Sequence, residues 1–429
     1  MKPLNILLIT YYWPPSGGSG VQRWLKFTKF LVRQGHHVEV LTPANPAFDL
    51  KDETLAADIP EAVKIHRVPI WEPTMLFGKK KQKEFTSNKL GGKNMSVFAK
   101  LMTWVRGNLL IPDGRLFWRK PASQQALKLL GDRHFDAVIT TGPPHSMHLI
   151  GQQIKEKHKS ITWIADFRDT WSQIDFLQEF GTTHWAMARH RKLEQRVLSQ
   201  ADIVTTVNDK TGELLNDLTD RKIEILHNGY DPDDFMMDLE LQDEDRFVIS
   251  HFGLLNRVRY PENLLLALEE LCEERPDFKE KFVLQLGGVI EDFILDRIKR
   301  SKHLSGAFEN CGYLSHREVI AKYQGSSLLL LLLNNTPLGK TIMTGKIYEY
   351  LAAGRPILGL GSTSSEPAQL VQRLGFGHFS EYDRKDSIKQ FISSIFDGEL
   401  ALANKKSTDI TIFSRDRNAR KLTELIRSL

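Results

Sequence analysis

Residues 344–358 read Thr-Gly-Lys-Ile-Tyr-Glu-Tyr-Leu-Ala-Ala-Gly-Arg-Pro-Ile-Leu, and this stretch indicates the fold more strongly than any other. It suits a helix with Glu349 near its start, and Gly354 and Pro356 then end the helix before an apolar strand. The backbone N–H groups and the positive dipole of a helix start stabilise phosphates, while a carboxylate accepts hydrogen bonds from ribose hydroxyls. The stretch therefore predicts a nucleotide-diphosphate site on an α/β fold; the alternative is an ordinary amphipathic helix before a buried strand.

The length and the composition of the chain bound the class of protein. Its 429 residues exceed one ordinary hydrophobic core and suit two domains of roughly 200 residues each. Cys272 and Cys311 are the only cysteines, which excludes a disulfide framework or a cysteine-based zinc site and favours a reducing cytosol. The first ten residues predict a β-strand rather than a signal peptide, because their apolar run is too short. The leucine run ending at Leu333 is too short to cross a bilayer and predicts a strand buried on both faces.

Basic and aromatic residues gather between Lys79 and Lys120, where Glu84 and Asp113 are the only acids. We interpret residues 76–120 as an insertion in the first domain. Such a composition is typical of a segment that binds an anionic membrane surface, of a nucleic-acid site, or of a solvated loop. Because no nucleic-acid-binding motif is nearby, we expect no nucleic-acid partner and favour the membrane surface. This would place a cytoplasmic protein peripherally at the inner face of the plasma membrane.

Apolar β-branched runs alternate with helical patterns along the chain, which is typical of parallel α/β architecture. The series restarts after a polar, acidic stretch, so we predict two Rossmann-like domains facing across a cleft, with the ligand at the carboxyl ends of their strands. The predicted parts are residues 1–230, a linker at 231–246, residues 247–410, and a C-terminal helix at 411–429. The predicted strands are Asn5–Thr10, His37–Leu41, Lys64–Val68, Ala137–Thr141, Ile161–Ala165, Ile203–Val207, Ile223–Leu226, Phe247–Phe252, Phe282–Leu286, Ala307–Cys311, Ser327–Leu333 and Pro356–Gly359.

A glycine-rich turn with Gly17, Gly18 and Gly20 lies between the first predicted strand and the first predicted helix. Glycines there let backbone N–H groups approach a phosphate closely, and an ordinary tight turn is the alternative. The turn departs from the dinucleotide fingerprint, because Arg23 stands where a third small residue belongs and the second strand runs into Pro43 without an acid for the ribose. We therefore expect no nicotinamide or flavin cofactor.

Further candidate residues follow predicted strands in both domains. Arg257 and Arg259 follow the first strand of the second domain, where two guanidinium groups can bind a diphosphate and neutralise a leaving group. The alternative is a pair of solvated surface arginines. In the first domain, His145 can hydrogen-bond a sugar hydroxyl or a reacting oxygen, although a lone histidine more often has a structural role. Asp166 or Asp169, after the next strand, can accept a proton or orient an acceptor.

Four segments together resemble the retaining glycosyltransferases of family 4, which have the GT-B fold. The glycine-rich turn and residues 34–40 look like the amino terminus of the family, and residues 227–231 resemble its interdomain Asn-Gly-x-Asp. Residues 346–356 are similar to its donor-binding helix, particularly in members that assemble bacterial surface polysaccharides. The resemblance implies the GT-B fold, with the C-terminal helix packing back on the first domain.

The resemblance also implies roles for individual residues. Glu349 would bind the nucleotide ribose, the backbone at Met343 and Thr344 would face the phosphates, and Arg259 matches a phosphate-binding lysine of the family. We expect the donor to be bound by Gly17, Gly18, Arg257, Arg259, Met343, Thr344, Lys346 and Glu349, and catalysis to involve His145, Asp166 and Arg259. Two positions depart from the family: Thr341 replaces the first acid of its Glu-x7-Glu motif, and Leu254 replaces an arginine for which Arg257 would substitute.

The activity implied by the resemblance is transfer of a hexosyl or N-acetylhexosaminyl group from a nucleotide-diphosphate sugar, with retention at the anomeric carbon. The acceptor would be a glycan or a lipid-linked saccharide in cell-surface polysaccharide biosynthesis, and no metal would be needed. Two alternatives stay open. A non-catalytic GT-B subunit that binds a nucleotide or a glycan is favoured by Thr341; a sugar-nucleotide epimerase would need a different set of acids and histidines around the sugar.

Overall fold

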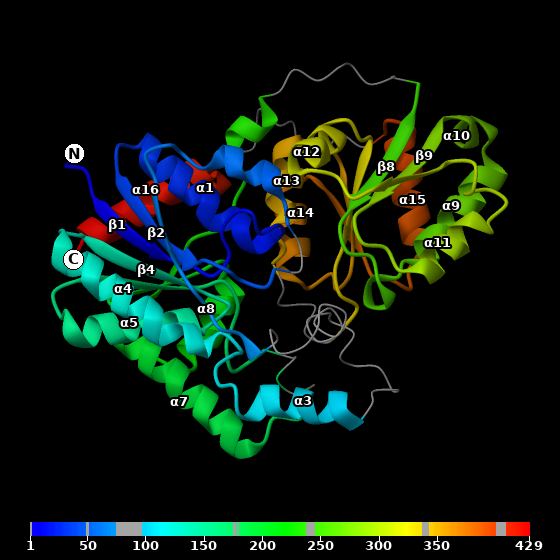
Figure 1. Cartoon of the computed structure of the whole chain (residues 1–429). Coiled ribbons are helices and arrows are strands. Elements are labelled where there is room, and N and C mark those ends of the chain that lie inside the picture. Colours follow the sequence, from blue (N-terminus) through cyan, green and yellow to red (C-terminus); the bar gives the residue numbers. More distant parts are fainter. Residues whose placement is uncertain are drawn as a thin grey trace. The chain divides into compact units, whose positions relative to one another are not determined.

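The structure is a computed structural model that describes residues 2–48, 51–73, 97–174, 177, 180–236, 245–336, 343–399 and 409–429. The chain divides into two compact units (Figure 1): unit 1 is Met1–Asn228 with Arg415–Leu429, and unit 2 is Gly229–Ser414. Part of the predicted linker, residues 237–244, lies outside the described residues, and Pro232–Phe235 in its first part forms a 3₁₀ helix, η4. Residues 76–96 of the predicted insertion also lie outside them.

Unit 1 contains a parallel seven-stranded sheet in the order β3-β2-β1-β4-β5-β6-β7. The strands are β1 (Asn5–Ile9), β2 (His37–Pro43), β3 (Lys64–Val68), β4 (Ala137–Gly142), β5 (Thr162–Phe167), β6 (Ile203–Thr206) and β7 (Ile223–Ile225). The helices are α1 (Ser19–Arg33), α3 (Val97–Asn108), α4 (Arg119–Asp132), α5 (Ser146–Lys157), α7 (His184–Gln200), α8 (Asp209–Asn216) and α16 (Arg415–Arg427). The predicted strands of this half are confirmed, with one correction: β5 continues to Phe167, so Asp166 lies inside the strand and not in the loop after it.

Strand β1 shows why this sheet is buried on both faces. Its side chains alternate between two hydrophobic clusters: Ile6 and Leu8 pack with α1 and α16, while Leu7 and Ile9 pack with α4 and α5. All of them are buried. A strand covered on both faces must be apolar at every position, and this is why an uninterrupted apolar run predicted it correctly.

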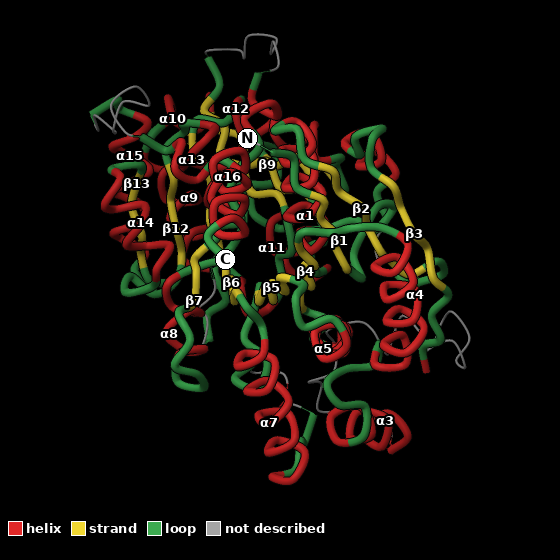
Figure 2. The backbone as a smooth tube through the Cα atoms, turned by 90° about the vertical axis from the view of Figure 1, so that its left-hand side faces the viewer, coloured by secondary structure: helices red, strands yellow, loops and turns green. Residues whose placement is uncertain are grey.

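The C-terminal helix α16 belongs to unit 1 and lies beside α1 (Figures 1 and 2), which confirms the prediction that it packs back on the first domain. Three of its apolar side chains, Ala419, Leu422 and Ile426, are buried in the same cluster as the apolar face of α1. At its start, the Gln34 side chain donates a hydrogen bond of 3.0 Å to Asp416, and at its end Arg427 donates one of 2.7 Å to the Lys2 carbonyl.

Unit 2 contains a parallel six-stranded sheet in the order β10-β9-β8-β11-β12-β13. The strands are β8 (Phe247–Phe252), β9 (Phe282–Gly287), β10 (Phe308–Gly312), β11 (Leu328–Leu332), β12 (Ile357–Leu360) and β13 (Gly377–Ser380). The helices are α9 (Glu262–Glu274), α10 (Pro276–Lys281), α11 (Asp292–Lys299), α12 (His316–Gln324), α13 (Lys346–Ala353), α14 (Glu366–Leu374) and α15 (Lys385–Phe396). The five strands predicted for this half are confirmed, and β13 is an additional strand that the sequence did not predict.

The stretch at residues 344–358 forms the helix and the strand that it predicts. Helix α13 ends at Gly354, which has a φ of 67° in the left-handed region that glycine tolerates best, and β12 begins three residues later. Every residue of β11 is buried, as predicted for the leucine run. Each unit is therefore a Rossmann-like α/β layer structure. Among the described residues, no helix combines the length and the apolar character needed to cross a bilayer.

Candidate functional site

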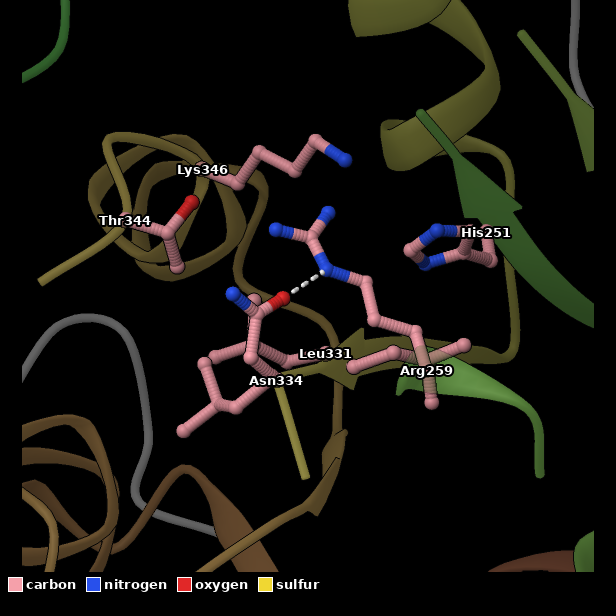
Figure 3. Close-up of a pocket in the computed structure, with 8 residues that line it drawn as sticks. His251, Arg259, Leu331, Asn334, Thr344 and Lys346 are labelled. Atoms are coloured by element: carbon pink, nitrogen blue, oxygen red, sulfur yellow. Dashed lines mark hydrogen bonds between the residues drawn. The ribbon is translucent and has the colours of Figure 1, made fainter. Parts of the chain in front are cut away.

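A small pocket in unit 2 lies at the carboxyl ends of β8 and β11 (Figure 3). Strand β8 contributes His251, the segment Leu331–Asn334 comes from the end of β11, and Thr344 and Lys346 come from the start of α13. Arg259 completes the lining from a short 3₁₀ helix, η5 (Arg257–Arg259), after β8. Because parallel strands end at one edge of the sheet, these segments meet although they are far apart in sequence.

Arg259 is held in the pocket by polar contacts to its own unit. Its Nε donates a hydrogen bond of 2.7 Å to Asn334 Oδ1, and one terminal nitrogen donates a weaker one of 3.3 Å to the Leu254 carbonyl. Figure 3 shows the guanidinium pointing toward the side of the pocket where the Lys346 ammonium lies. Burial lowers the pKa of Arg259 from its ordinary value, and nearby Tyr382 opposes this shift.

Lys346 brings a second cation into the same pocket. Its ammonium packs against the backbone of Gly253, where an added Cβ would lie 1.9 Å from Nζ, so a larger residue there would displace the Lys346 ammonium. Burial, and next the charge of Arg259, lower the pKa of Lys346 to about 8, against the opposing attraction of Glu349. Within the described part of the chain, neither Lys346 nor Arg259 has a carboxylate within 4.0 Å. Two neighbouring cations with no described carboxylate within ion-pair distance make this pocket a candidate anion site.

The start of α13 adds the field of a helix to these two charges. Its N-cap residue, Gly345, has no side chain to cover the first N–H groups of the helix. Thr344 lines the pocket directly, whereas the Met343 side chain packs on a hydrophobic cluster under β11 and β12. The positive end of the helix dipole and both cations therefore act on the same small space. Thr341, which replaces an acid of the family motif, lies outside the described residues.

Glu349 lies one turn along α13, next to a histidine that the sequence did not single out. Its Oε1 is 4.0 Å from Nε2 of His316, the first residue of α12, and the same nitrogen lies 3.1 Å from Asp234 Oδ2 in η4. The histidine therefore lies between two carboxylates and limits the positions that the Glu349 carboxylate can take. Neither His316 nor Asp234 belongs to a motif, and only the packing of α12 on η4 brings them to Glu349.

Arg257 does not line this pocket. Its side chain is exposed, and its guanidinium carbon lies 5.5 Å from the centre of the Phe293 ring. His251, in contrast, lines the pocket and was not predicted; its Nδ1 lies 2.9 Å from the Leu330 carbonyl. Burial, and next the charge of Lys346, lower the pKa of His251 to about 3, so it is neutral and adds no third charge.

In unit 1, Asp166 is the centre of a buried hydrogen-bond cluster. Arg23 donates through Nε at 3.1 Å and through a terminal nitrogen at 2.7 Å, and Trp24 donates at 2.7 Å. The hydroxyls of Thr141 and Thr205 add bonds of 2.9 and 2.8 Å. Burial would raise the pKa of Asp166, but Arg23 and these hydrogen bonds hold it below its ordinary value. With five bonds accepted, the carboxylate joins α1 to the sheet, and the geometry favours a structural role over the predicted catalytic one.

His145 is the N-cap residue of α5, and its ring stacks on Trp171 with 5.2 Å between centroids and 5° between planes. Among the described residues, neither of its ring nitrogens has a hydrogen-bond partner. Burial, and next His148, lower its pKa well below the ordinary value, so the ring is neutral at pH 7. A neutral imidazole can donate one hydrogen bond and accept another, which suits a hydroxyl ligand.

The glycine-rich turn of unit 1 is tied to the loop that carries His145. Gly18 has a φ of 86°, which favours glycine, and it precedes α1 without a side chain to cap the helix. Arg168 donates a hydrogen bond of 2.8 Å to the Gly20 carbonyl and others to the carbonyls of Gly142 and Pro143. Within unit 1, Gly17, Gly18 and His145 thus belong to one connected loop cluster. The described residues contain no group of three or more His, Cys, Asp or Glu side chains that could hold a metal ion.

The chain resembles known proteins in sequence and in fold. Residues 18–229 match the model of the glycosyl transferase 4-like domain. The glycosyltransferase of Rickettsia africae ESF-5 aligns with a TM-score of 0.63 at 14% identity, over 100% of this chain and 99% of that one. WaaG, a glycosyltransferase involved in lipopolysaccharide biosynthesis, aligns with a TM-score of 0.58 at 12% identity, over 97% and 99%.

A putative UDP-N-acetylglucosamine 2-epimerase from Listeria monocytogenes aligns equally far, with a TM-score of 0.58 at 11% identity, over 100% of this chain and 96% of that one. No curated protein matches the sequence. At these identities the solved structures establish the fold alone, and that fold is GT-B, as predicted. The prediction that the two units face each other across a cleft stays a prediction.

Proposed function

The chain is a glycosyltransferase of family 4, with a glycosyl transferase 4-like domain at residues 18–229, and from this premise we propose its donor, its acceptor and the roles of its residues. The donor is a nucleotide-diphosphate sugar that carries a hexosyl or N-acetylhexosaminyl group. The acceptor is a glycan or a lipid-linked saccharide of a cell-surface polysaccharide. One observation carries the proposal: Arg259 and Lys346 point into one pocket at the start of α13, and no described carboxylate lies within 4.0 Å of either charge.

A diphosphate supplies the negative charge that this pocket lacks. Arg259, already oriented by Asn334, can present two N–H groups to one phosphate, and Lys346 can present an ammonium to the same group. The N–H groups at the start of α13 add donors that need no rearrangement. Because charge builds up on the diphosphate as the sugar leaves, these groups stabilise the transition state more than the bound donor. We therefore propose that the reaction proceeds without a metal ion.

Glu349 is placed to hold the nucleoside part of the donor. Its carboxylate can accept hydrogen bonds from two ribose hydroxyls, and His316 restrains it through the contact at 4.0 Å. The Glu349 side chain is partly exposed at the start of the same helix that faces the phosphates, so one short element addresses both parts of the nucleotide. This matches the role that the family resemblance implies for this residue.

The proposed transfer retains the anomeric configuration by attack on the face from which the diphosphate leaves. The bond between the anomeric carbon and the phosphate oxygen breaks, the acceptor oxygen bonds to the same carbon, and the acceptor proton passes to the released phosphate oxygen. This route needs no carboxylate as a base, and Asp166 has no unused acceptor position to act as one. His145, neutral and with both ring nitrogens buried without a hydrogen-bond partner among the described residues, is assigned to a hydroxyl of the transferred sugar.

The acceptor class is supported by the relatives and by the charge of the chain. WaaG is involved in lipopolysaccharide biosynthesis, which is the assembly of a surface polymer. A polymer built on a lipid carrier is reached at a membrane surface, and the basic and aromatic residues of the segment 76–120 suit an anionic one. We therefore propose that the protein works peripherally at the inner face of the plasma membrane.

The experiment that tests the proposal is a donor screen for release of a nucleoside diphosphate, with and without acceptor mixtures. Glu349→Ala should lose most of the release, while Glu274→Ala, on an exposed part of α9, should keep it. Tight donor binding without release on any acceptor would instead support the non-catalytic subunit. Conversion of the donor at a rate that does not depend on the acceptor would support an epimerase. The putative epimerase from Listeria monocytogenes has a similar fold.

A further inference from the structure

Helix α3 and the first turn of α7 lie side by side at one end of unit 1, as both views of the backbone show (Figures 1 and 2). The Asn108 amide connects them: it donates a hydrogen bond of 3.2 Å to the Gly181 carbonyl and accepts one of 2.7 Å from the Thr183 N–H. The Arg106 guanidinium lies 4.8 Å from the centre of the Phe180 ring in the same connection. Since these contacts are mostly buried, the two helices form one fixed surface, which we call the α3–α7 surface.

Large apolar side chains are exposed on this surface. Leu101 is 56% exposed and Trp104 41% on α3, Leu109 just after the helix is 60% exposed, and Trp185 at the start of α7 is 61% exposed. The opposite side of α3, with Thr103 and Gly107, is the side that is buried. Single exposed apolar residues are ordinary, but four at one end of a domain mark a surface that contacts something apolar.

The charge around these side chains is positive. Along α7, Trp185 is followed by Arg189, Lys192 and Arg196 at helical spacing, and all of them are exposed. The only acid of α7, Glu194, is buried and accepts hydrogen bonds from the backbone of residues 171 and 172. On α3, Lys100 is exposed, and residues 97–112 contain no acid. The outward side of α7 therefore carries basic residues without acidic ones.

We propose that the α3–α7 surface docks on an anionic lipid bilayer, with Leu101, Trp104 and Trp185 at the depth of the headgroups and Arg189, Lys192 and Arg196 over them. Tryptophan favours the boundary between headgroups and acyl chains, and basic residues on a helix are attracted to anionic lipids. A nucleic acid would use the arginines but leave the exposed leucines without a contact. The inference rests on the proposed function in one respect: the membrane on which the surface docks is the one that would contain the lipid-linked acceptor.

This surface shares α3 with the segment 76–120 that the sequence predicts, but it excludes other residues of that segment and adds α7. Trp118 is fully buried, with its indole N–H donating to the Val68 carbonyl, and Arg115 pairs with the buried Glu72 at 3.1 Å, so these two residues of the segment 76–120 face the interior. The lysine run at 79–83 lies outside the described residues. The α7 residues, in contrast, were not predicted, because basic residues on a helix are usually only a solvated face and nothing in the sequence places them beside α3.

Flotation with lipid vesicles tests the proposal. The full chain should float with vesicles of phosphatidylglycerol and phosphatidylcholine and much less with phosphatidylcholine alone. The paired variant Trp104→Ser, Trp185→Ser and the paired variant Arg189→Glu, Lys192→Glu should each reduce the bound-to-free ratio about tenfold or more, since each basic residue contributes about fivefold to such binding. The matched controls, Leu429→Ser and the pair Lys128→Glu, Lys157→Glu, change equally exposed residues elsewhere in unit 1 and should float like the unchanged chain.

Flotation that is equal for all variants would overturn the proposal, and so would binding to a soluble polyanion such as DNA with no binding to vesicles. Turnover of a soluble acceptor separates this inference from the proposed function, because the four substituted positions lie outside the candidate site and should leave that turnover unchanged. A chain that floats but shows no donor turnover contradicts the proposed function alone. A chain that turns over the soluble acceptor but does not float contradicts this inference alone.

Discussion

Each unit contains a cluster of charged residues, and the two clusters differ in whether other residues of the chain compensate the charge. In unit 1, the buried Asp166 carboxylate accepts five hydrogen bonds, two of them from Arg23, so its charge is compensated by the protein itself. In unit 2, Arg259 and Lys346 point into one pocket and meet no carboxylate among the described residues. A compensated charge stabilises the fold, whereas uncompensated cations cost free energy until an anion binds. The comparison separates a residue that builds the structure from residues that bind a ligand.

The largest expected effect is on the structural side of this comparison. Asp166→Ala leaves the Arg23 guanidinium, which is 2% exposed, buried without its partner. Breaking a buried ion pair in this way costs about 3–5 kcal/mol, so the free energy of unfolding measured with urea should fall by about that amount. Asp169→Asn, at an exposed position nearby, is the control and should change stability little. A stable Asp166→Ala protein without turnover would restore the catalytic role that the sequence predicts.

Arg259 gives the next largest effect, and Arg257 is its matched control two residues away. Arg259→Met removes the guanidinium from the pocket, and turnover should fall by about 10²–10³-fold, the usual loss when one preorganised donor to a developing anion is removed. Arg257→Met removes a side chain that lies over Phe293, and turnover should change at most a few-fold. Initial rates of nucleoside diphosphate release measure both variants. A larger loss for Arg257→Met would mean that Arg257 is the donor-binding arginine, as the sequence also predicts.

The sequence predicts those parts of the fold whose stability depends on residues that are close together in the chain. The α13–β12 stretch is local, since Gly354 and Pro356 end the helix and an apolar run follows, and the structure confirms it. Strand β13 was missed because Gly377–Ser380 is short and has no apolar run; it is a strand because it pairs with β12. The sequence gives no comparable clue to a strand whose stability comes from its neighbour.

The site follows the same division. Lys346 and Arg259 carry their chemistry in their side chains and lie close to strand ends, so both were predicted. The hydrogen bonds that occupy the Asp166 carboxylate were not predicted, because their donors lie on α1, β4 and β6 and come together only in the folded chain. His316 was missed for the same reason: it is a histidine at the start of an ordinary helix until α12 packs next to η4 and α13.

The pH dependence of donor binding tests whether the charge of Lys346 binds the diphosphate. With a pKa of about 8, Lys346 is charged below pH 7 and progressively neutral above pH 8. A diphosphate binds the charged form and raises the pKa of Lys346 in the complex, so affinity should be constant below about pH 7. It should then fall by up to tenfold per pH unit above about pH 8. Isothermal titration with the nucleoside diphosphate between pH 6.5 and 9.5 measures this, and Lys346→Met should bind weakly at every pH with no such slope.

The same pKa predicts an opposite trend in stability without ligand. Because the folded pKa of Lys346 lies below its unfolded value, the unfolded chain binds more protons between these two values, and the Lys346 contribution to stability should rise with pH there. Lys346→Met should remove this rise in urea titrations. Affinity and stability that both fall above pH 8 would show that Lys346 is compensated by a group in the chain, and the contrast with Asp166 would be lost.

The smallest expected effect concerns His316. This residue contacts the carboxylates of Asp234 and Glu349, and we expect it to affect the donor only by restraining Glu349. His316→Gln removes the group that restrains Glu349, so the KM for the donor should rise a few-fold while kcat stays nearly unchanged. His303→Gln, on a turn before β10, is the control. Substitution with arginine should restore the KM, since its guanidinium can donate hydrogen bonds to both Glu349 and Asp234. If His316→Gln lowers kcat and leaves KM unchanged, the histidine acts on the reacting groups themselves, and the division into structural and ligand-binding charge must include a third class.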